Sequence, residues 1–244
     1  MRKDPRRFIA YLPAACLSAA ALLVPGCSAP PMSERMTDAI GTLSRVQSSR
    51  QPVDADVLRG ARGIAIVDET QAGLVISGAG GRGILMRRNG SEWSAPCAIK
   101  VEGFGVGLTA GGEGRSLVIV FSTDEALDAF VADGSYFMAQ AQGTFGDSHG
   151  RTREPVQSSD QVHAYAVADG VYGTAALGGI GFKIDTEANA RQYGAEVTQW
   201  DILDGKAPRP AGHTALVSRI ERAVERTDTA RPDEAAASHE PSEK

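Results

Sequence analysis

Glycine is the residue that most constrains how this chain can fold. The 244 residues include 28 glycines but only 7 Phe, 5 Tyr and 2 Trp. Glycine or Asn-Gly separates short runs of β-branched residues, such as Gly63–Val67, Ala98–Val101 and Leu117–Phe121. Glycine weakens helices and serves tight turns and close strand contacts, whereas β-branched residues favour strands. The pattern predicts a globular chain with a sheet of short strands rather than a helical bundle.

Several segments with helical spacing surround these runs. Met36, Ile40, Leu43 and Val46 predict a helix from Ser33, and a shorter one follows Pro52. Further helices are expected after the capping box 122–125, at 185–191, at 197–203 and at 213–224. Between the first two of these we expect a helical segment at 135–141 and a polar loop at 143–160. Asn89-Gly90 predicts a hairpin turn.

The N-terminus has the organisation of an export signal. Residues 1–7 carry four positive charges and one negative charge, and an apolar segment from Phe8 to Val24 follows. A basic start and an apolar run before small residues are typical of a signal peptide. Val24-Pro25-Gly26-Cys27 resembles a bacterial lipobox, in which cleavage leaves a lipid-modified cysteine. Simple secretion and an uncleaved membrane anchor remain alternatives.

The cysteines agree with a lipoprotein. Cys16 would be removed with the signal peptide 1–26 and Cys27 would carry acyl chains such as palmitate, which leaves Cys97 as the one remaining thiol. Cys97 is expected to pack as a small hydrophobic residue. Cleavage would change the net charge from −5 to −8, and this acidic balance argues against nucleic-acid binding.

A series of motifs, in a fixed order, resembles the SYLF-domain family. They are Gly63–Val67, Ala72–Val75, Gly80–Leu85, Trp93–Pro96, Phe104–Gly107, Asp124–Phe130, Ala164-Tyr165 and Asp201–Gly205. The resemblance covers residues 32–210 and implies a compact α+β domain, with a sheet of short, glycine-rich antiparallel strands, N-terminal helices and short peripheral helices. Around it we expect a tether at 27–31, a C-terminal helix at 211–226 and a disordered tail at 227–244.

The resemblance also implies a general function. Members of the family are described as lipid-binding, with phosphoinositide binding in eukaryotic relatives and actin binding in fungal ones. Here Arg35, Arg45 and Arg50 of the first helix are accompanied by Glu34 and Asp38. This helix is less basic than in many members, which weakens an expectation of phosphoinositide selectivity.

Two motifs in the sequence resemble catalytic or cofactor sites. Gly78–Gly83 matches the glycine pattern of a dinucleotide-binding fold, but a strand-like run follows it where the phosphate needs a helix N-terminus. Gly146–Gly150, with Ser148 and His149, matches a nucleophile elbow, but Thr152–Pro155 is a poor helix start. We therefore expect no catalytic residue, no cofactor and no metal.

The glycine-alternating segments 103–107 and 173–181 allow two interpretations. In the first, the glycines serve sheet packing. In the second, they open a shallow apolar groove with charged residues at its rim. The walls would be Phe104, Val106, Leu177, Ile180 and Phe182, and the candidates for a phosphate headgroup are Arg82, Arg87, Arg88, Lys100 and Lys183. Those cations can equally be solvated edge charges.

The sequence thus predicts a non-enzymatic lipid-binding protein. It would be anchored through Cys27 in a bacterial cell envelope, at the periplasmic face of the outer membrane, with membrane phospholipid as its partner. The alternative is a structural or protein-interaction module of the envelope with an unknown protein partner. An esterase-like hydrolase ranks third.

Overall fold

The computed structural model describes residues 30–73, 76–133 and 161–237. The signal peptide, Cys27, the predicted segments 135–141 and 143–160 and the last seven residues lie outside these ranges. The helices are α1 (Met32–Gln47), α2 (Ala55–Gly60), α3 (Asp124–Asp133), α4 (Thr186–Tyr193), α5 (Gln199–Leu203) and α6 (His213–Ala237). The strands are β1 (Gly63–Gly73), β2 (Ile76–Asn89), β3 (Glu92–Trp93), β4 (Cys97–Phe121) and β5 (Val162–Ile184).

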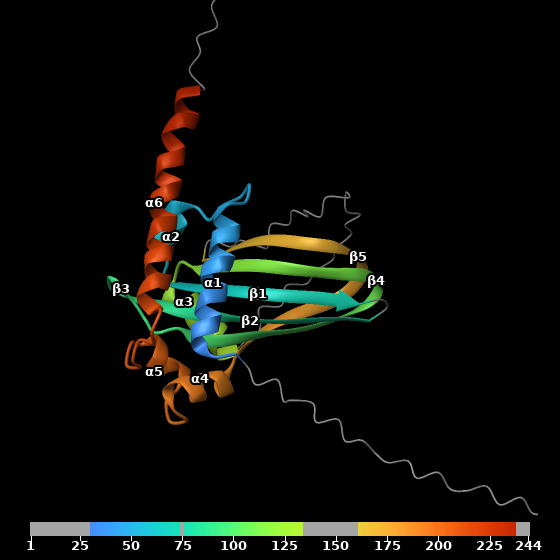
Figure 1. The fold of residues 1–244 in the computed structure, drawn as a ribbon, viewed down its shortest axis with the longest axis horizontal. Helices are drawn as coiled ribbons and strands as arrows, with labels where there is room; N and C mark the ends of the chain where they lie inside the picture. The colour runs from blue at the N-terminus through green and yellow to red at the C-terminus, as the bar shows by residue number, and fades with distance from the viewer. Residues whose placement is uncertain (1–29, 74–75, 134–160, 238–244) are drawn as a thin grey trace, which may run out of the picture.

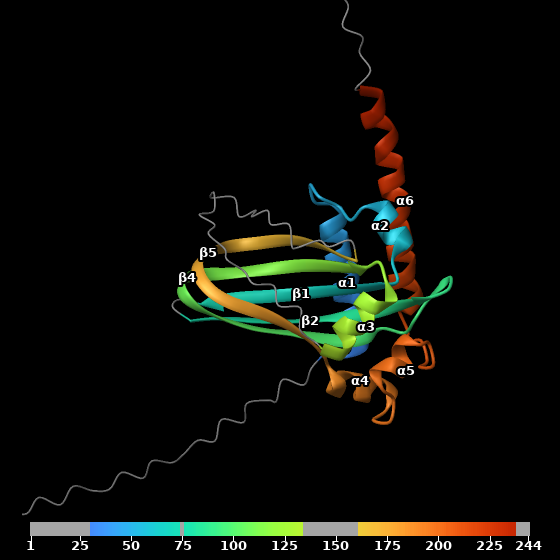
Figure 2. The same cartoon turned by 180° about the vertical axis from the view of Figure 1, so that it is seen from behind.

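The described strands form one antiparallel sheet in the order β3-β2-β1-β4-β5. Strand β4 bends around the β1–β2 hairpin, because its first part pairs with β2 (Cys97 opposite Leu85) and its second part with β1 (Phe121 opposite Gly63). Strand β5 follows β4 along nearly its whole length. The result is a strongly curved sheet, crossed on one face by α1 (Figure 1) and carrying α3 behind it (Figure 2).

The predicted α+β class and antiparallel sheet are confirmed, but the strands are longer than the apolar runs suggested. The runs 98–101 and 117–121 both belong to β4, which continues through the glycines between them. Hydrophobic runs mark only the part of a strand that is buried, whereas backbone pairing along β1, β2 and β5 keeps the glycine-rich part extended as well.

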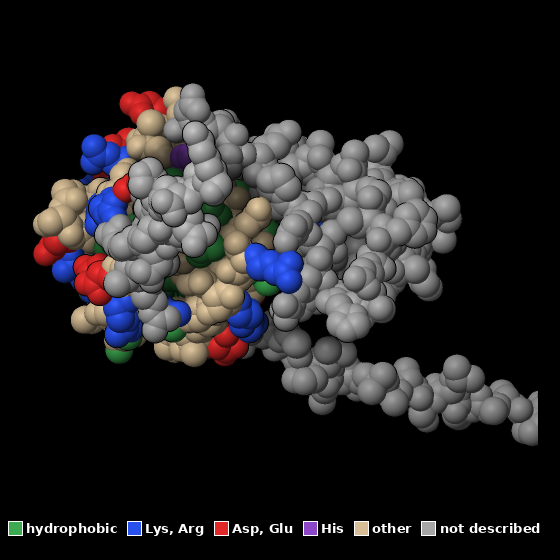
Figure 3. Space-filling model, turned by 90° about the horizontal axis from the view of Figure 1, so that it is seen from above, with side chains coloured by type: hydrophobic (Ala, Val, Ile, Leu, Met, Phe, Trp, Pro, Cys, Tyr) green, Lys and Arg blue, Asp and Glu red, His purple; other side chains and the backbone are tan. Residues whose placement is uncertain are grey.

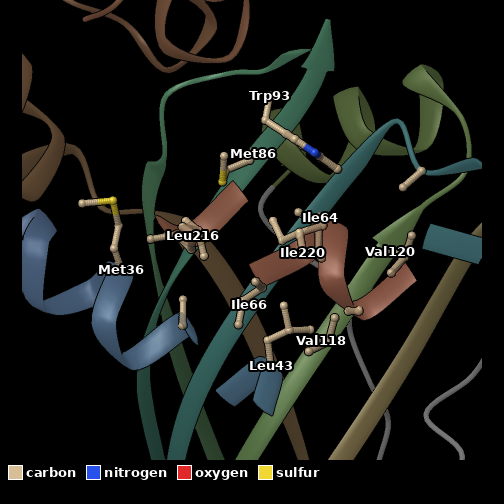
Figure 4. Close-up of a cluster of buried hydrophobic side chains, with 14 of the residues drawn as sticks. Met36, Leu43, Ile64, Ile66, Met86, Trp93, Val118, Val120, Leu216 and Ile220 are labelled. Atoms are coloured by element: carbon tan, nitrogen blue, oxygen red, sulfur yellow. The ribbon is translucent and has the colours of Figure 1, made fainter. Parts of the chain in front are cut away.

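Alternation along the strands produces two cores, one on each face of the sheet. On the first face, Ile64 and Ile66 of β1 pack with Met36 of α1 and with Leu216 and Ile220 of α6 (Figure 4). On the second face, Phe130 of α3 packs between Phe121 and Phe182, at ring-centroid distances of 5.0 and 5.5 Å. The helices therefore cover that part of the sheet in which the strands carry large side chains.

The predicted helix starts agree closely with the structure. Asp54 and Asp185 cap α2 and α4 through their side chains, and Thr123 rather than Ser122 caps α3, accepting a hydrogen bond from the backbone of Ala126. The expected hairpin is confirmed at Asn89-Gly90, where Gly90 has a φ of 65°. That conformation favours glycine.

The C-terminal prediction was wrong in one respect. Helix α6 continues to Ala237, although residues from 227 onward were expected to be disordered. The expected end relied on Pro232 and on the polar composition, but Ala and Glu at 234–237 are good helix formers. Helix α6 projects beyond the sheet in Figure 1.

Candidate functional site

One strip of the sheet surface has no side chain larger than a methyl group. The register places Ala72 of β1 between Gly78 of β2 and Gly112 of β4, and all three residues are exposed. A Cβ atom added at Gly78 would meet nothing within 4 Å. We call Gly78, Ala72 and Gly112 the smooth strip. Its apolar, flat surface is suited to contact with an acyl chain, which needs no directional polar groups.

Three of the predicted groove residues, Phe104, Val106 and Leu177, continue this strip in the backbone register, whereas Ile180 lies opposite Gly103, at the alternate positions that belong to the other face of the sheet. Phe104 of β4 lies opposite Gly78 on one side and Gly179 of β5 on the other. Val106 lies opposite Ile76 and Leu177. Their side chains lie outside the described part of the structure, so the register alone associates them with the smooth strip.

Phe182, the fifth predicted groove residue, has a different environment. Its side chain is only 1% exposed and packs against Phe130 within the second core. This burial argues against Phe182 as the wall of an open groove and favours the packing interpretation at this position.

Three of the predicted cations form one row across the sheet. Arg82 of β2, Lys100 of β4 and Lys183 of β5 are direct neighbours in the register, and their side chains are 43%, 43% and 60% exposed. We call them the charged row. Figure 3 shows acidic and basic side chains interspersed over the described part of the face that it views.

Each cation of the charged row has acidic partners. Lys100 and Lys183 donate to the two carboxylate oxygens of Glu102, at 2.8 and 2.7 Å. The hydrogen bond from Lys100, followed by that from Lys183, lowers the pKa of Glu102 to about 2. Arg82 contacts Glu34 and Asp38 of α1 at 3.1 and 3.2 Å. The row is therefore exposed but balanced in charge.

The remaining two predicted cations lie elsewhere on β2. Arg87 pairs with Asp128 of α3 and with Asp204 after α5. Arg88 lies over the Trp93 ring and donates to the carbonyl of Arg59, at 2.8 Å. These guanidinium groups hold helices and the β2–β3 turn in place, which argues against a headgroup role for them.

The glycine pattern 78–83 does not form a nucleotide-binding turn. It lies inside β2, with no helix following it. A Cβ atom at Gly81 or Gly83 would lie under 3.0 Å from the backbone of β1. These two glycines permit close approach of β1 and β2, as the sequence predicted for the motif by default.

No other reactive group emerges in the described residues. Burial raises the pKa of the Cys97 thiol to about 12, which leaves it protonated and inert at neutral pH. His213 is buried, with Nε2 2.9 Å from the carbonyl oxygen of Ser94. The described segments contain no cluster of three or more potential metal ligands. Ser148 and His149 lie outside them.

Sequence reasoning missed a buried ion pair between α1 and the start of α4. Arg35 is 2% exposed, pairs with Asp185 and donates to the carbonyl of Ile99 at 2.9 Å. Burial lowers the pKa of Arg35, and the neighbouring Asp185 opposes that shift. The position of Arg35 between Met32 and Ala39, on the buried stripe of α1, was the available signal.

Comparison with known proteins identifies the family of this chain. The profile of the Ysc84 family, described as "Las17-binding protein actin regulator", matches residues 102–223. The chain belongs to the Ysc84/SYLF-domain family. The resemblance seen in the sequence is thereby confirmed.

Curated members of the Ysc84/SYLF family include human and yeast proteins. Human SH3 domain-containing YSC84-like protein 1 is 32% identical over 65% of this chain and 48% of its own length. LAS seventeen-binding protein 3 of Saccharomyces cerevisiae is 30% identical over 69% of this chain and 38% of its own. The chain thus spans about half or less of these relatives. The yeast relative is named as a binding protein, and neither name is that of an enzyme. No solved structure matches the chain significantly.

Proposed function

We propose that this SYLF-domain protein is a non-enzymatic lipid-binding protein of a bacterial cell envelope, attached to the membrane through an acylated Cys27. Lipid would bind over the smooth strip and the neighbouring positions of Phe104 and Val106. None of the helices in the described segments combines the length and hydrophobicity needed to cross a bilayer. The lipobox-like sequence before Cys27 supports attachment by acylation.

The observation that carries the proposal is the contrast between the two parts of the curved sheet. Near the helices, strand residues such as Ile66, Leu85 and Val118 are fully buried. Beyond Asp68 and Arg82, the strands expose Ala72, Gly78 and Gly112. A chain that exposes a flat apolar strip next to polar groups offers a surface for an apolar ligand.

The anchor is tested by replacing Cys27 with serine. We expect the wild-type protein to fractionate with membranes and the Cys27→Ser protein to become soluble or to keep its signal peptide. Each buried methylene of an acyl chain contributes about 0.8 kcal/mol, so the loss of two chains outweighs any surface contact. Membrane fractionation and intact-protein mass spectrometry measure the result.

Cys16→Ser is the matched control, because Cys16 would be removed with the signal peptide. It is expected to leave both fractionation and mass of the mature protein unchanged. A Cys27→Ser protein with wild-type fractionation and mass would rule out acylation at this residue.

The lipid surface is tested by placing a charge on the smooth strip. In protein beginning at Ser28, we expect Gly78→Glu to weaken vesicle binding at least about tenfold, or about 1.4 kcal/mol, because an acyl chain would then have to desolvate a carboxylate. The fold should tolerate the change, since the added Cβ meets nothing within 4 Å. Co-sedimentation with vesicles and the thermal midpoint are the measurements.

Gly60→Glu is the matched control for this experiment. Gly60, at the end of α2, is also exposed and open, but it lies outside the smooth strip. It should leave vesicle binding unchanged. Equal binding by both variants would exclude the smooth strip as the lipid surface. Failure of the wild-type protein to bind vesicles would favour the alternative of a protein-interaction module.

A further inference from the structure

The distance between the proposed anchor and the folded domain is short. Helix α1 begins at Met32, five residues after Cys27. Five residues span at most about 18 Å even when the chain is fully extended. This inference rests on the proposed acylation of Cys27. Given that anchor, the first turn of α1 stays within about 18 Å of the lipid surface.

The surface around the first turns of α1 is therefore held close to the bilayer by this short tether. There Glu34 and Asp38 contact Arg82 of the charged row, and the buried Arg35 pairs with Asp185 at the start of α4. The opposite end of α1 has other neighbours, because Arg45 donates to Asp68. Figure 1 shows α4 next to the lower end of α1 and α2 near its upper end.

This surface carries both signs of charge in equal number. The charged row contributes three cations, and their ion-pair partners Glu34, Asp38 and Glu102 contribute three carboxylates. The low pKa of Glu102, about 2, keeps its carboxylate ionised at neutral pH. A surface without net charge gains little binding free energy from the negative potential of an anionic membrane, because that potential attracts surfaces with net positive charge.

We propose that the charged row and the start of α4 face the bilayer that holds the anchor, and that this surface takes zwitterionic phospholipid headgroups. The lipid phosphate pairs with Lys100 and Lys183, and the lipid ammonium pairs with Glu102. A headgroup replaces the two existing ion pairs of Glu102, with Lys100 and Lys183, by three ion pairs to the lipid, so docking needs no excess charge on either side.

The orientation is tested with two single labels on the full, acylated chain in vesicles of zwitterionic phospholipid. Thr186→Cys places a fluorophore at the exposed start of α4, and Gln51→Cys places one beyond the opposite end of α1. Cys97 does not compete for the label, since it is buried and its pKa is about 12. A nitroxide on the lipid headgroup serves as the quencher.

We expect quenching at least about twofold stronger at residue 186 than at residue 51, because the helix separates the two ends by about 20 Å. Equal quenching, or stronger quenching at residue 51, would overturn the orientation. Fractionation of the same samples distinguishes failure of the proposed anchor from failure of the proposed orientation. Protein that is not bound to membranes would refute the anchor. Membrane-bound protein with the wrong quenching pattern would refute the orientation alone.

The headgroup preference is tested by removing the central carboxylate. In protein that carries the label at residue 186 and no other change, quenching should be at least as strong in zwitterionic as in anionic vesicles. Glu102→Gln leaves Lys100 and Lys183 uncompensated, so quenching should rise in anionic vesicles and fall again with salt. Glu221→Gln, at an exposed position on α6, is the matched control and should change nothing. Stronger quenching of the wild type in anionic vesicles, or a silent Glu102→Gln, would overturn this pairing.

Discussion

Replacing Arg35 with alanine should lower the free energy of unfolding by about 3–5 kcal/mol. Arg35 is 2% exposed, and its guanidinium pairs with Asp185 and donates to Ile99. Removing it leaves the Asp185 carboxylate buried without its main compensating charge, and an uncompensated buried charge is far more costly than a lost surface pair. Urea unfolding followed by circular dichroism at neutral pH measures the loss.

Arg45→Ala provides the matched control on the same helix. Arg45 also bonds a carboxylate, that of Asp68, but its side chain is 45% exposed. Water can solvate the carboxylate that remains, so the expected cost is about 1 kcal/mol. If Arg35→Ala and Arg45→Ala lower the free energy of unfolding by the same amount, the inference that burial makes the Arg35–Asp185 pair more important is wrong.

Gly83→Ala is expected to destabilise the protein by about 1–3 kcal/mol or more, although it adds only one methyl group. The new Cβ would lie under 3.0 Å from the backbone of Ile66 and Val67 in β1. Backbone atoms of a paired strand cannot move aside as a flexible side chain can, so the β1–β2 pairing must distort. A fall in the thermal midpoint of about 2–4 °C per kcal/mol is expected for a domain of this size.

Gly80→Ala tests whether this effect is specific to the tight positions. Gly80 lies in the same strand, but a Cβ atom there meets nothing within 4 Å. Replacing a glycine at an unstrained position usually stabilises by about 0.4–1 kcal/mol, so the midpoint should stay or rise. Similar losses in both variants would show that β2 rejects side chains for a reason other than close strand approach.

Local sequence patterns were sufficient for most helices and for the sheet class. The 3.6-residue spacing of Met36, Ile40 and Leu43 predicted α1, because an amphipathic helix must bury one face. Side-chain caps such as Asp185 marked helix starts, since they satisfy free backbone amides there. The extension of α6 beyond residue 226 was not predicted, because the polar, proline-containing composition of residues 227–244 was taken as a sign of disorder.

Candidate site residues were harder to assign, because their roles depend on register. Nothing in the sequence distinguishes Arg82 from Arg87, yet the first belongs to an exposed row and the second pairs with Asp128 and Asp204. Likewise Phe104 and Phe182 both follow glycines in apolar strands. Phe182 proved to be a core residue because α3 brings Phe130 against it.

The sequence by itself determined the family, the α+β class, the antiparallel sheet and the positions of most helices, since these follow from short-range periodicity and motif order. Only the tertiary structure decided which glycines are tight and which are open. That difference arises where β2 pairs with β1, because Gly81 and Gly83 lie against the backbone of β1 whereas Gly78 and Gly80 have open space beside them. Backbone contacts between paired strands set these distances, and the run of glycines in the sequence does not encode them.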